Sequence, residues 1–476
     1  MIEDFEGCYR FMQSRDPRYD GFFVVGVTST RVYCRPSCPA RLPYRRNVRL
    51  FRGVAAAQHE GFRACKRCDP DGAPGSPAWN RRADVAGRAV RLIADGAVDR
   101  EGVGGLAARL HFSERQLGRI LVGELGAGPV ALARAQRAQS ARTLIESTEL
   151  PFAQVAVGAG FGSVRQFNET LRAVYGRTPT ELRSRARRSR RAVAAPGTIE
   201  LRLPCREPFD GGSLVAFLAA RSIPGVEEVE GDTYRRTMAL EHGPAVVALT
   251  PEDRIVRAEL RLADLRDLTA AVARCRRLFD LDADPLAISS QLAEDRALAP
   301  LVDARPGLRV PGCVDGFELA VRAIVGQQVS VAAARTVLGR IATGHGGAVT
   351  EPDGGLTHRF PGAAALAELD PAALPFPRKR VEALRSLARL VAAGELQLDA
   401  GADAGETRVR LMEIRGVGEW TASYIAMRAL GDPDVFLPGD VGIRHALARL
   451  GTEAVPERWR PWRSYAVMQL WRSLDG

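Results

Sequence analysis

Apolar residues recur with the period of an α-helix at several places along the chain, and one such pattern follows Gly418. The apolar positions there lie three and four residues apart, as on one face of a helix: Ala422, Ile425, Ala426, Ala429 and Leu430. Another helical pattern ends just before Gly416, so Gly416-Val417-Gly418 is predicted to be a hairpin between two helices. Such a hairpin presents backbone N–H groups at a helix N-terminus, whose partial positive charge suits a phosphate. The pattern indicates a contact with a nucleic-acid backbone, and a plain tight turn between two helices is the alternative.

A second helical pattern occurs twice in the N-terminal half. Residues 106–126 and 155–176 each read as a short helix, a turn, an N-cap serine and a longer amphipathic helix. The Ser-x-x-Gln capping box fits both copies, at Ser113 with Gln116 and at Ser163 with Gln166. Together with the closing GRTPTELR, at residues 176–183, this repeat resembles an AraC-type domain with two helix-turn-helix motifs. A helical bundle that only connects neighbouring domains is the alternative.

The AraC resemblance implies that the longer helix of each copy enters a major groove of DNA. These recognition helices are predicted to begin at Glu114 and Val164. Three arginines would then lie near their exposed faces: Arg115, Arg119 and Arg165. Promoter DNA is the partner implied, with RNA polymerase as a further expected partner.

Apolar and polar residues alternate with a period of two over much of the segment between about residues 198 and 309. The segments TIELRL, GDTYRRTMAL and AVVALT predict strands, whereas SLVAFLAARSIPG and the run after Leu262 predict helices. This region is therefore expected to form a small mixed α/β domain.

Charge is distributed unevenly along the chain. The net charge of +11 consists of +15 through Arg191 and −4 beyond it, which suggests nucleic acid or another anionic surface as a partner. The alternative is that the positive charge reflects an Arg-rich composition on a solvated face and no specific partner. The stretch RSRARRSRR, at residues 183–191, is predicted to be a disordered basic linker. No apolar run approaches the roughly 18 residues of a membrane span, and the acidic N-terminus lacks a signal-peptide core, so a cytoplasmic, membrane-free chain is expected.

Four cysteines have the spacing of metal ligands. Cys34 and Cys38 lie in YCRPSC, and Cys65 and Cys68 lie in ACKRC, so two short loops could deliver four thiolates to a tetrahedral zinc ion. A purely structural zinc site is one interpretation of this spacing. The remaining cysteines have no motif spacing and are expected to be reduced thiols in the core: Cys8, Cys205, Cys275 and Cys313.

The sequence around these cysteines resembles the N-terminal domain of the Ada DNA-repair proteins. The segments that carry the resemblance are DPRYDGFFVVGVTSTRVYCRPSCPAR and GFRACKRCDP. That resemblance implies that Cys34 accepts a methyl group from a methylated DNA phosphotriester. A zinc-bound thiolate is deprotonated at neutral pH and is the nucleophilic form of cysteine. Methylation would turn this ligand into a neutral thioether, and the lower negative charge should raise the affinity for DNA.

The C-terminal region resembles the helix-hairpin-helix, Gly/Pro-Asp superfamily of DNA glycosylases, and more closely the AlkA-type 3-methyladenine DNA glycosylases II. Four ordered blocks carry the resemblance: FELAVRAIVGQQVSVAAA, the glycine hairpin, VFLPGDVGIRHAL and RWRPWRSYAVMQLW. It implies that Asp440 is the catalytic aspartate, that Gly416 and Gly418 contact the DNA backbone, and that aromatic side chains form the base pocket. These are Trp420, Tyr424 and Trp471, with Phe217 as a further aromatic implied by EPFDGGSLVAFLAARSI.

The chemistry agrees with this assignment. Cleavage of an N-glycosidic bond builds oxocarbenium charge on the sugar, which a carboxylate can stabilise while it orients a water molecule. Superfamily members that also cut the strand carry a lysine where this chain has Trp420, so a monofunctional glycosylase without a cofactor is expected. The resemblance also implies that Gln328 occupies the position whose side chain is wedged into the DNA duplex in this family.

The sequence therefore predicts a multidomain, mostly helical α+β protein. Its expected parts are a four-cysteine zinc module (residues 1–75), a double helix-turn-helix domain (80–183), a basic linker (184–197), a mixed α/β domain (198–310) and an all-α glycosylase domain (311–476). The expected function is excision of N-alkylated bases from duplex DNA by a monomer, joined to methyl-phosphotriester acceptance and transcriptional regulation. The alternative is a methylation-triggered activator whose glycosylase fold only scans DNA.

Overall fold

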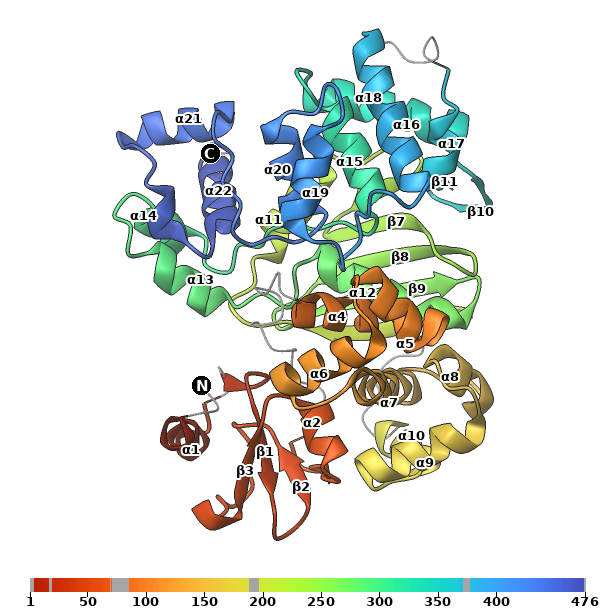
Figure 1. Cartoon of the computed structure of the whole chain (residues 1–476), viewed down its shortest axis with the longest axis vertical. Helices are drawn as coiled ribbons and strands as arrows, with labels where there is room; N and C mark the ends of the chain where they lie inside the picture. Colours follow the sequence, from red (N-terminus) through yellow and green to blue (C-terminus); the bar gives the residue numbers. More distant parts are fainter. Residues whose placement is uncertain are drawn as a thin grey trace. The chain divides into compact units, whose positions relative to one another are not determined.

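The computed structural model describes residues 4–16, 19–68, 70, 85–187, 197–370 and 377–474. The chain divides into two compact units, Met1–Pro204 with Leu262–Ala273, and Cys205–Arg261 with Arg274–Gly476. The expected mixture of small sheets and predominant helices is confirmed (Figure 1). Every helix in the described ranges is too short or too polar to cross a lipid bilayer.

The first unit begins with a small α/β module. Its elements are α1 (Phe5–Ser14), β1 (Val24–Val27), β2 (Val32–Cys34), η2 (Arg45–Asn47), β3 (Val48–Phe51), α2 (Val54–His59) and β4 (Arg63–Ala64). The strands form a sheet in the order β3-β1-β2-β4, in which β1 is antiparallel to β2 and β3 while β2 and β4 are parallel. The core beside this sheet includes Cys8, Tyr9 and Phe23, so Cys8 is a buried core residue as predicted.

Seven helices follow in the first unit, in the part of the chain described here. They are α4 (Val85–Ala94), α5 (Ala97–Arg109), α6 (Glu114–Leu125), α7 (Pro129–Ser147), α8 (Phe152–Gly158), α9 (Val164–Tyr175) and α10 (Pro179–Arg187). The long helix α7 packs against α2, α4, α8 and α10. Buried alanines such as Ala138 and Ala141 allow these neighbours to approach it closely.

Both predicted helix-turn-helix copies are present, as α5–α6 and α8–α9, and their second helices begin at Glu114 and Val164 as expected. Ser113 and Gln116 form the complete capping box. In the other copy, the Ser163 hydroxyl accepts a hydrogen bond of 3.2 Å from the backbone N–H of Gln166. Helix α10 extends to Arg187, into the range predicted as linker, and residues 188–196 of that range lie outside the described residues.

The mixed α/β region contains the predicted strands and two further ones. Its elements are β5 (Ile199–Pro204), α11 (Gly211–Ala219), β6 (Glu227–Glu230), β7 (Thr233–Ala239), β8 (Pro244–Pro251), β9 (Ile255–Leu262), η4 (Leu265–Asp267) and α12 (Leu268–Leu278). Strands β6 to β9 are consecutive neighbours in the sheet, and β7 is antiparallel to β6 and β8. Helix α11 packs against β6 and β7. The alternating burial along β8 and β9 explains the period of two in the sequence.

Beyond α12, the described residues of the second unit form helices and one β-hairpin. The elements are α13 (Pro285–Leu292), α14 (Ala299–Ala304), α15 (Gly316–Val325), α16 (Val331–His345), β10 (Ala348–Asp353), β11 (Leu356–His358), α17 (Ala363–Ala367), α18 (Arg378–Ala392), α19 (Ala404–Met412), α20 (Glu419–Arg428), α21 (Val441–Leu450), η5 (Pro456–Trp459) and α22 (Arg463–Arg472). The hairpin of β10 and β11 is an addition to the all-α domain predicted here. Helix α15 is buried over most of its length and packs against α16, α18 and α20.

Candidate functional site

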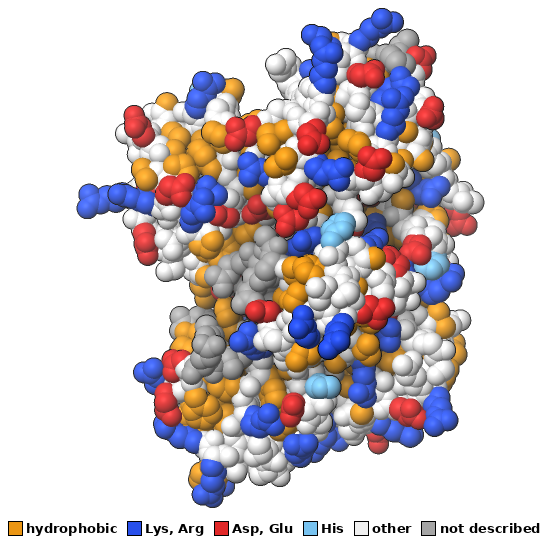
Figure 2. Space-filling model, viewed as in Figure 1, with side chains coloured by type: hydrophobic (Ala, Val, Ile, Leu, Met, Phe, Trp, Pro, Cys, Tyr) orange, Lys and Arg blue, Asp and Glu red, His pale blue; other side chains and the backbone are white. Residues whose placement is uncertain are grey.

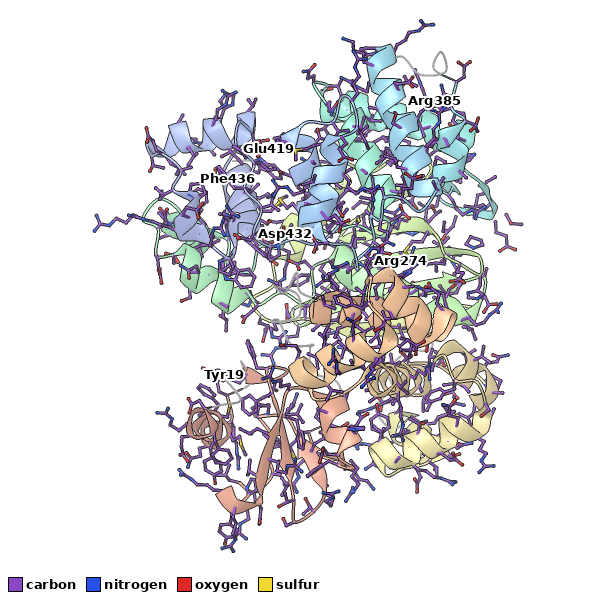
Figure 3. The ribbon with its side chains drawn as sticks, in the orientation of Figure 1. Tyr19, Arg274, Arg385, Glu419, Asp432 and Phe436 are labelled. Atoms are coloured by element: carbon purple, nitrogen blue, oxygen red, sulfur yellow. The ribbon has the colours of Figure 1, made fainter. Side chains whose placement is uncertain are left out.

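The glycine hairpin connects α19 to α20. Gly416 has a φ of +98°, which is strained for any residue with a side chain, whereas Gly418 has a φ of −93° and caps α20. Val417 between them is buried and fixes the hairpin to the protein, while Gly416 and Gly418 are exposed. Figure 3 labels Glu419 at the start of α20 and Asp432 beyond its end, which together bracket the helix. The N-terminus of α20 is exposed at Gly418 and Glu419 and can therefore present backbone N–H groups to a phosphate.

A neighbouring loop is tied to this hairpin by Gln327. The Gln327 amide nitrogen donates hydrogen bonds of 3.0 Å to the carbonyl oxygen of Gly416 and of 3.0 Å to the hydroxyl of Thr421. The next residue, Gln328, is exposed and has a left-handed φ of +55°. Since this backbone conformation is unfavourable outside glycine, the fixed loop must hold it in place. The resemblance to glycosylases drew attention to Gln328 and missed Gln327, which ties the loop to the hairpin.

Asp440 is the N-cap residue of α21, and three donors reach its carboxylate. Oδ1 accepts hydrogen bonds from the Ile443 amide at 2.8 Å and from the Trp471 indole at 2.9 Å. Oδ2 accepts a bond of 2.9 Å from the Trp420 indole. The helix N-terminus adds a favourable partial positive charge. The carboxylate is thus held in one orientation by two aromatic rings and one helix.

The same aromatic rings line a cavity of about 660 Å³. Trp420 and Tyr424 are stacked, with ring centroids 5.2 Å apart and planes inclined by 7°, and the Trp471 ring lies 6.3 Å from that of Tyr424. Asp440 and Phe217 line this cavity as well. All five side chains predicted for the base pocket and the catalysis of base release therefore lie together.

Two arginines that the sequence analysis missed modify the role of Phe217. The guanidinium carbons of Arg221 and Arg428 lie 3.8 and 4.9 Å from the centre of its ring. The ring is already engaged in cation–π contacts, so it has less to offer a cationic ligand than Trp420 or Trp471. Arg428 follows Trp420 and Tyr424 at intervals of four residues along α20, a helical spacing that could have drawn attention to it.

Gly442 is a further cavity residue, which lies in the block VFLPGDVGIRHAL but was not singled out from the sequence. A Cβ atom at this position would lie 3.1 Å from Trp471 Cδ1 and 3.2 Å from Asp440 Oδ1. A side chain here would therefore press on the contact between the indole and the carboxylate. Glycine permits that close approach.

Buried ion pairs stiffen another part of the cavity wall. Glu227 and Glu318 bind Arg236 at 3.1 and 2.7 Å, and Arg322 binds the same two carboxylates at 2.5 Å each. Burial alone would raise the pKa of Glu318, but the charges of Arg236 and Arg322 outweigh it and hold that pKa below its ordinary value. Two acids and two bases compensate one another, so this wall adds no net charge to the cavity.

In the first unit, the four predicted zinc ligands form a cluster. The parallel pairing of β2 with β4 sets Tyr33 opposite Ala64 and so brings Cys34 beside Cys65. The ligand atoms of Cys34, Cys38, Cys65 and Cys68 all lie within 4.8 Å of one another. A tetrahedron of sulfur atoms at 2.3 Å from zinc has edges of about 3.8 Å, so small shifts would complete the site. The cysteine thiols therefore fit a zinc ion.

Asp20 shapes the loop between Cys34 and Cys38. Its buried carboxylate accepts hydrogen bonds from the Ser37 amide at 3.0 Å and from the Ser37 hydroxyl at 2.6 Å, and Arg35 lies 3.5 Å away. A hydrogen bond between Cys34 and Cys38 raises the pKa of the Cys34 thiol and lowers that of the Cys38 thiol. Cys34 is 9% exposed.

The predicted recognition arginines are exposed. Arg115 and Arg119 belong to α6, and Arg165 belongs to α9. The Arg165 side chain is 88% exposed and forms a surface pair of 2.9 Å with Glu169. On the face drawn in Figure 2, basic side chains stand among acidic ones rather than in one uninterrupted patch.

Family models match three parts of the chain: the metal binding domain of Ada over residues 7–71, a helix-turn-helix domain over residues 106–185, and the AlkA N-terminal domain over residues 200–315. Over 483 residues, the chain is 53% identical to the "Probable bifunctional transcriptional activator/DNA repair enzyme AlkA" of Mycobacterium tuberculosis, with 100% of this chain and 97% of that protein covered. It is 38% identical to the DNA-3-methyladenine glycosylase 2 of Escherichia coli, over 56% of this chain and 94% of that protein.

One solved structure, a 3-methyladenine DNA-glycosylase from Archaeoglobus fulgidus, covers 57% of this chain and 96% of its own, with a TM-score of 0.50 and 22% identity. At this level of identity the likeness concerns the fold alone.

Proposed function

Because the chain belongs to the family of bifunctional transcriptional activator/DNA repair AlkA proteins, we propose that it excises N-alkylated bases such as 3-methyladenine from duplex DNA. The observation that carries the proposal is the Asp440 carboxylate, bound by the indoles of Trp420 and Trp471 at the wall of an aromatic cavity. A second function, methyl acceptance at a four-cysteine zinc site, rests on the separate cysteine cluster.

Asp440 would act on the sugar rather than on the base. As the bond between C1′ and the base nitrogen breaks, its electron pair leaves with the base and positive charge develops on the sugar. The carboxylate, already fixed by its donors, stabilises that charge without having to reorient. It also orients the water molecule whose oxygen then bonds to C1′.

The base would reach the cavity by leaving the duplex. The amides at the start of α20 hold the DNA backbone, and the exposed Gln328 fills the space that the base vacates. Trp420 and Trp471 then offer ring faces to a cationic alkylated purine, an attraction of roughly 0.5 to 2 kcal/mol. Damaged bases with weakened pairing would enter most readily.

The lining of the cavity supports a monofunctional reaction. The chain has two lysines, Lys66 and Lys379, and neither lines this cavity. Without an amine, a Schiff base with the sugar cannot form there. The product would be an abasic site in an uncut strand.

The zinc site would be held by Cys34, Cys38, Cys65 and Cys68, with Cys34 as the methyl acceptor. Zinc supplies the charge that keeps a bound cysteine in its thiolate form. The Cys34 sulfur attacks the methyl carbon of a phosphotriester, and the bond between that carbon and the phosphate oxygen breaks. The phosphate leaves as a diester, and mass spectrometry should locate one added methyl group on Cys34.

DNA binding by the helix-turn-helix motifs would connect methylation to transcription. Arg115, Arg119 and Arg165 have the exposure that contact with DNA needs. We assign the four functional parts to residues 1–75, 80–183, 198–310 and 311–476. Promoter DNA and RNA polymerase are the proposed partners of the first two.

The decisive experiment is base release from methylated duplex DNA by the full chain and by Asp440→Asn. Asparagine can still cap α21, so the fold should persist while the charge is lost. We expect at least a hundredfold slower release of 3-methyladenine. A matched control is Asp403→Asn, since Asp403 caps α19 through the Glu406 amide at 3.0 Å and does not line the cavity.

Wild-type release by Asp440→Asn would contradict the catalytic role. Absence of release by the unaltered protein, with duplex binding intact, would favour the alternative of a sensor that scans DNA without excising bases.

A further inference from the structure

Arg428 is a buried cation in the wall of the cavity. Its side chain is 4% exposed, and its nitrogen atoms donate hydrogen bonds to the carbonyl oxygen of Pro311, to that of Gly312 at 3.3 Å, and to the hydroxyl oxygen of Tyr424 at 2.7 Å. These acceptors are all uncharged. The positive charge of Arg428 is therefore fixed in place beside the cavity by groups that do not neutralise it.

This arrangement determines what the Tyr424 hydroxyl can do. A guanidinium group has only donors, so the phenol oxygen must be the acceptor in the bond to Arg428. The phenol proton is left to be donated to another group. The hydrogen bonds described for Tyr424 within the protein include no acceptor for that proton, and the residue is partly exposed and lines the cavity.

We propose that the Tyr424 hydroxyl donates a hydrogen bond to the base as it leaves, and that Arg428 is the positioning residue that makes this hydroxyl a donor. This inference rests on the proposed excision of bases. Stacking of Tyr424 on Trp420, at 7° between the planes, fixes the ring, and Arg428 fixes its oxygen. The nearby positive charge also strengthens the hydroxyl as a donor.

The consequence differs between two classes of base. A cationic base such as 7-methylguanine becomes neutral when it takes the electron pair of the C1′–N bond, so a donor contributes little. A neutral base such as hypoxanthine becomes an anion in the same step, and a hydrogen bond stabilises that charge until solvent supplies a proton. Tyr424 and Arg428 thus extend excision to neutral purines that carry an acceptor.

The experiment measures single-turnover release of hypoxanthine and of 7-methylguanine from otherwise identical duplexes. Tyr424→Phe retains the stacked ring and removes only the hydroxyl. We expect release of hypoxanthine to fall roughly tenfold more than release of 7-methylguanine. Arg428→Met should produce the same bias, meaning a larger loss of hypoxanthine release than of 7-methylguanine release. Arg428→Lys should restore part of the hypoxanthine rate, because lysine can still donate a hydrogen bond to the Tyr424 oxygen.

Adding Tyr424→Phe to Arg428→Met should cause no further bias, because both changes remove the same hydrogen bond to the base. The 7-methylguanine rate of each variant reports whether its cavity is still assembled. Equal losses for both bases would overturn the inference, as would additive biases in the double variant. Release of 7-methylguanine but not hypoxanthine by the unaltered protein would also overturn it, whereas release of neither base would contradict the proposed function itself.

Discussion

At the scale of the residue, Asp20 shows how one buried side chain can prepare a metal site. Its carboxylate accepts hydrogen bonds from both the backbone N–H and the hydroxyl of Ser37, the residue before Cys38 in the loop that begins at Cys34. The loop is thereby held in a conformation that points both thiols toward Cys65. Groups that orient metal ligands in this way contribute strongly to affinity although they never touch the metal.

Asp20→Ala should therefore weaken zinc binding by roughly ten- to a hundredfold. Competition with a chromogenic chelator on the full chain measures this affinity. Glu60→Ala is the matched control, because Glu60 belongs to the same module and its side chain forms an exposed pair with Arg49 at 3.0 Å. A zinc affinity of Asp20→Ala equal to that of the control would show that the loop needs no such support.

At the scale of the element, the hairpin between α19 and α20 depends on the conformation of one glycine. Gly416 adopts a left-handed φ of +98°, which an L-residue avoids at a cost of about 1–2 kcal/mol. Its carbonyl oxygen also accepts the hydrogen bond from Gln327 that ties on the adjoining loop. A change in this backbone would disturb both the helix N-terminus and the loop that carries Gln328.

We expect Gly416→Ala to weaken binding to duplex DNA by about tenfold, in keeping with that strain. Fluorescence anisotropy at fixed salt concentration measures the affinity. Gly418→Ala provides the comparison, because Gly418 has an ordinary φ of −93° and open space around its Cβ position, so only the smaller preference for glycine over alanine at an N-cap is lost. If the two variants bind DNA equally well, the left-handed turn is not what matters.

At the scale of the whole molecule, partly buried charge makes stability depend on pH. Asp280 accepts hydrogen bonds from the Tyr465 hydroxyl at 2.8 Å and from the Val310 amide at 3.2 Å. Burial raises the pKa of Asp280 from 3.8 to about 6, even though the charge of Arg309 opposes the shift. Between these values the folded protein holds a proton that the unfolded chain has released. Raising the pH across this window therefore lowers the free energy of unfolding.

Asp280→Asn should remove this dependence. Relative to the variant, the unaltered protein should lose about 2 kcal/mol of stability between pH 4 and pH 7. Urea unfolding followed by tryptophan fluorescence suits the measurement, since four of the five tryptophans, Trp420, Trp459, Trp462 and Trp471, belong to the second unit. Asp403→Asn is the control for a partly exposed aspartate. A stability difference that stays constant with pH would contradict the raised pKa of Asp280.

Patterns within short segments determined much of this protein from the sequence alone. The starts of α6 and α9 follow from N-cap serines and helical periodicity, and the strands β7 and β8 follow from alternation, because these signals depend on neighbours in the chain. The spacing within each cysteine pair predicted metal ligands for the same reason, whereas the pairing of β2 with β4 brings the two pairs together. Resemblance to known families led to Asp440 and its aromatic neighbours, which no local pattern would have assembled.

Tertiary structure decided the contacts between residues that are distant in sequence. Asp20 reaches Ser37, Gln327 reaches Gly416, and Phe217 meets Arg428 only because the chain folds back on itself. A polar residue in the sequence gives no sign of the partner that will satisfy it, since burial and hydrogen bonding are fixed by packing. The sequence thus determined which elements form and which chemistry they carry. Packing decided the orientation of each reactive group and which other side chains hold it there.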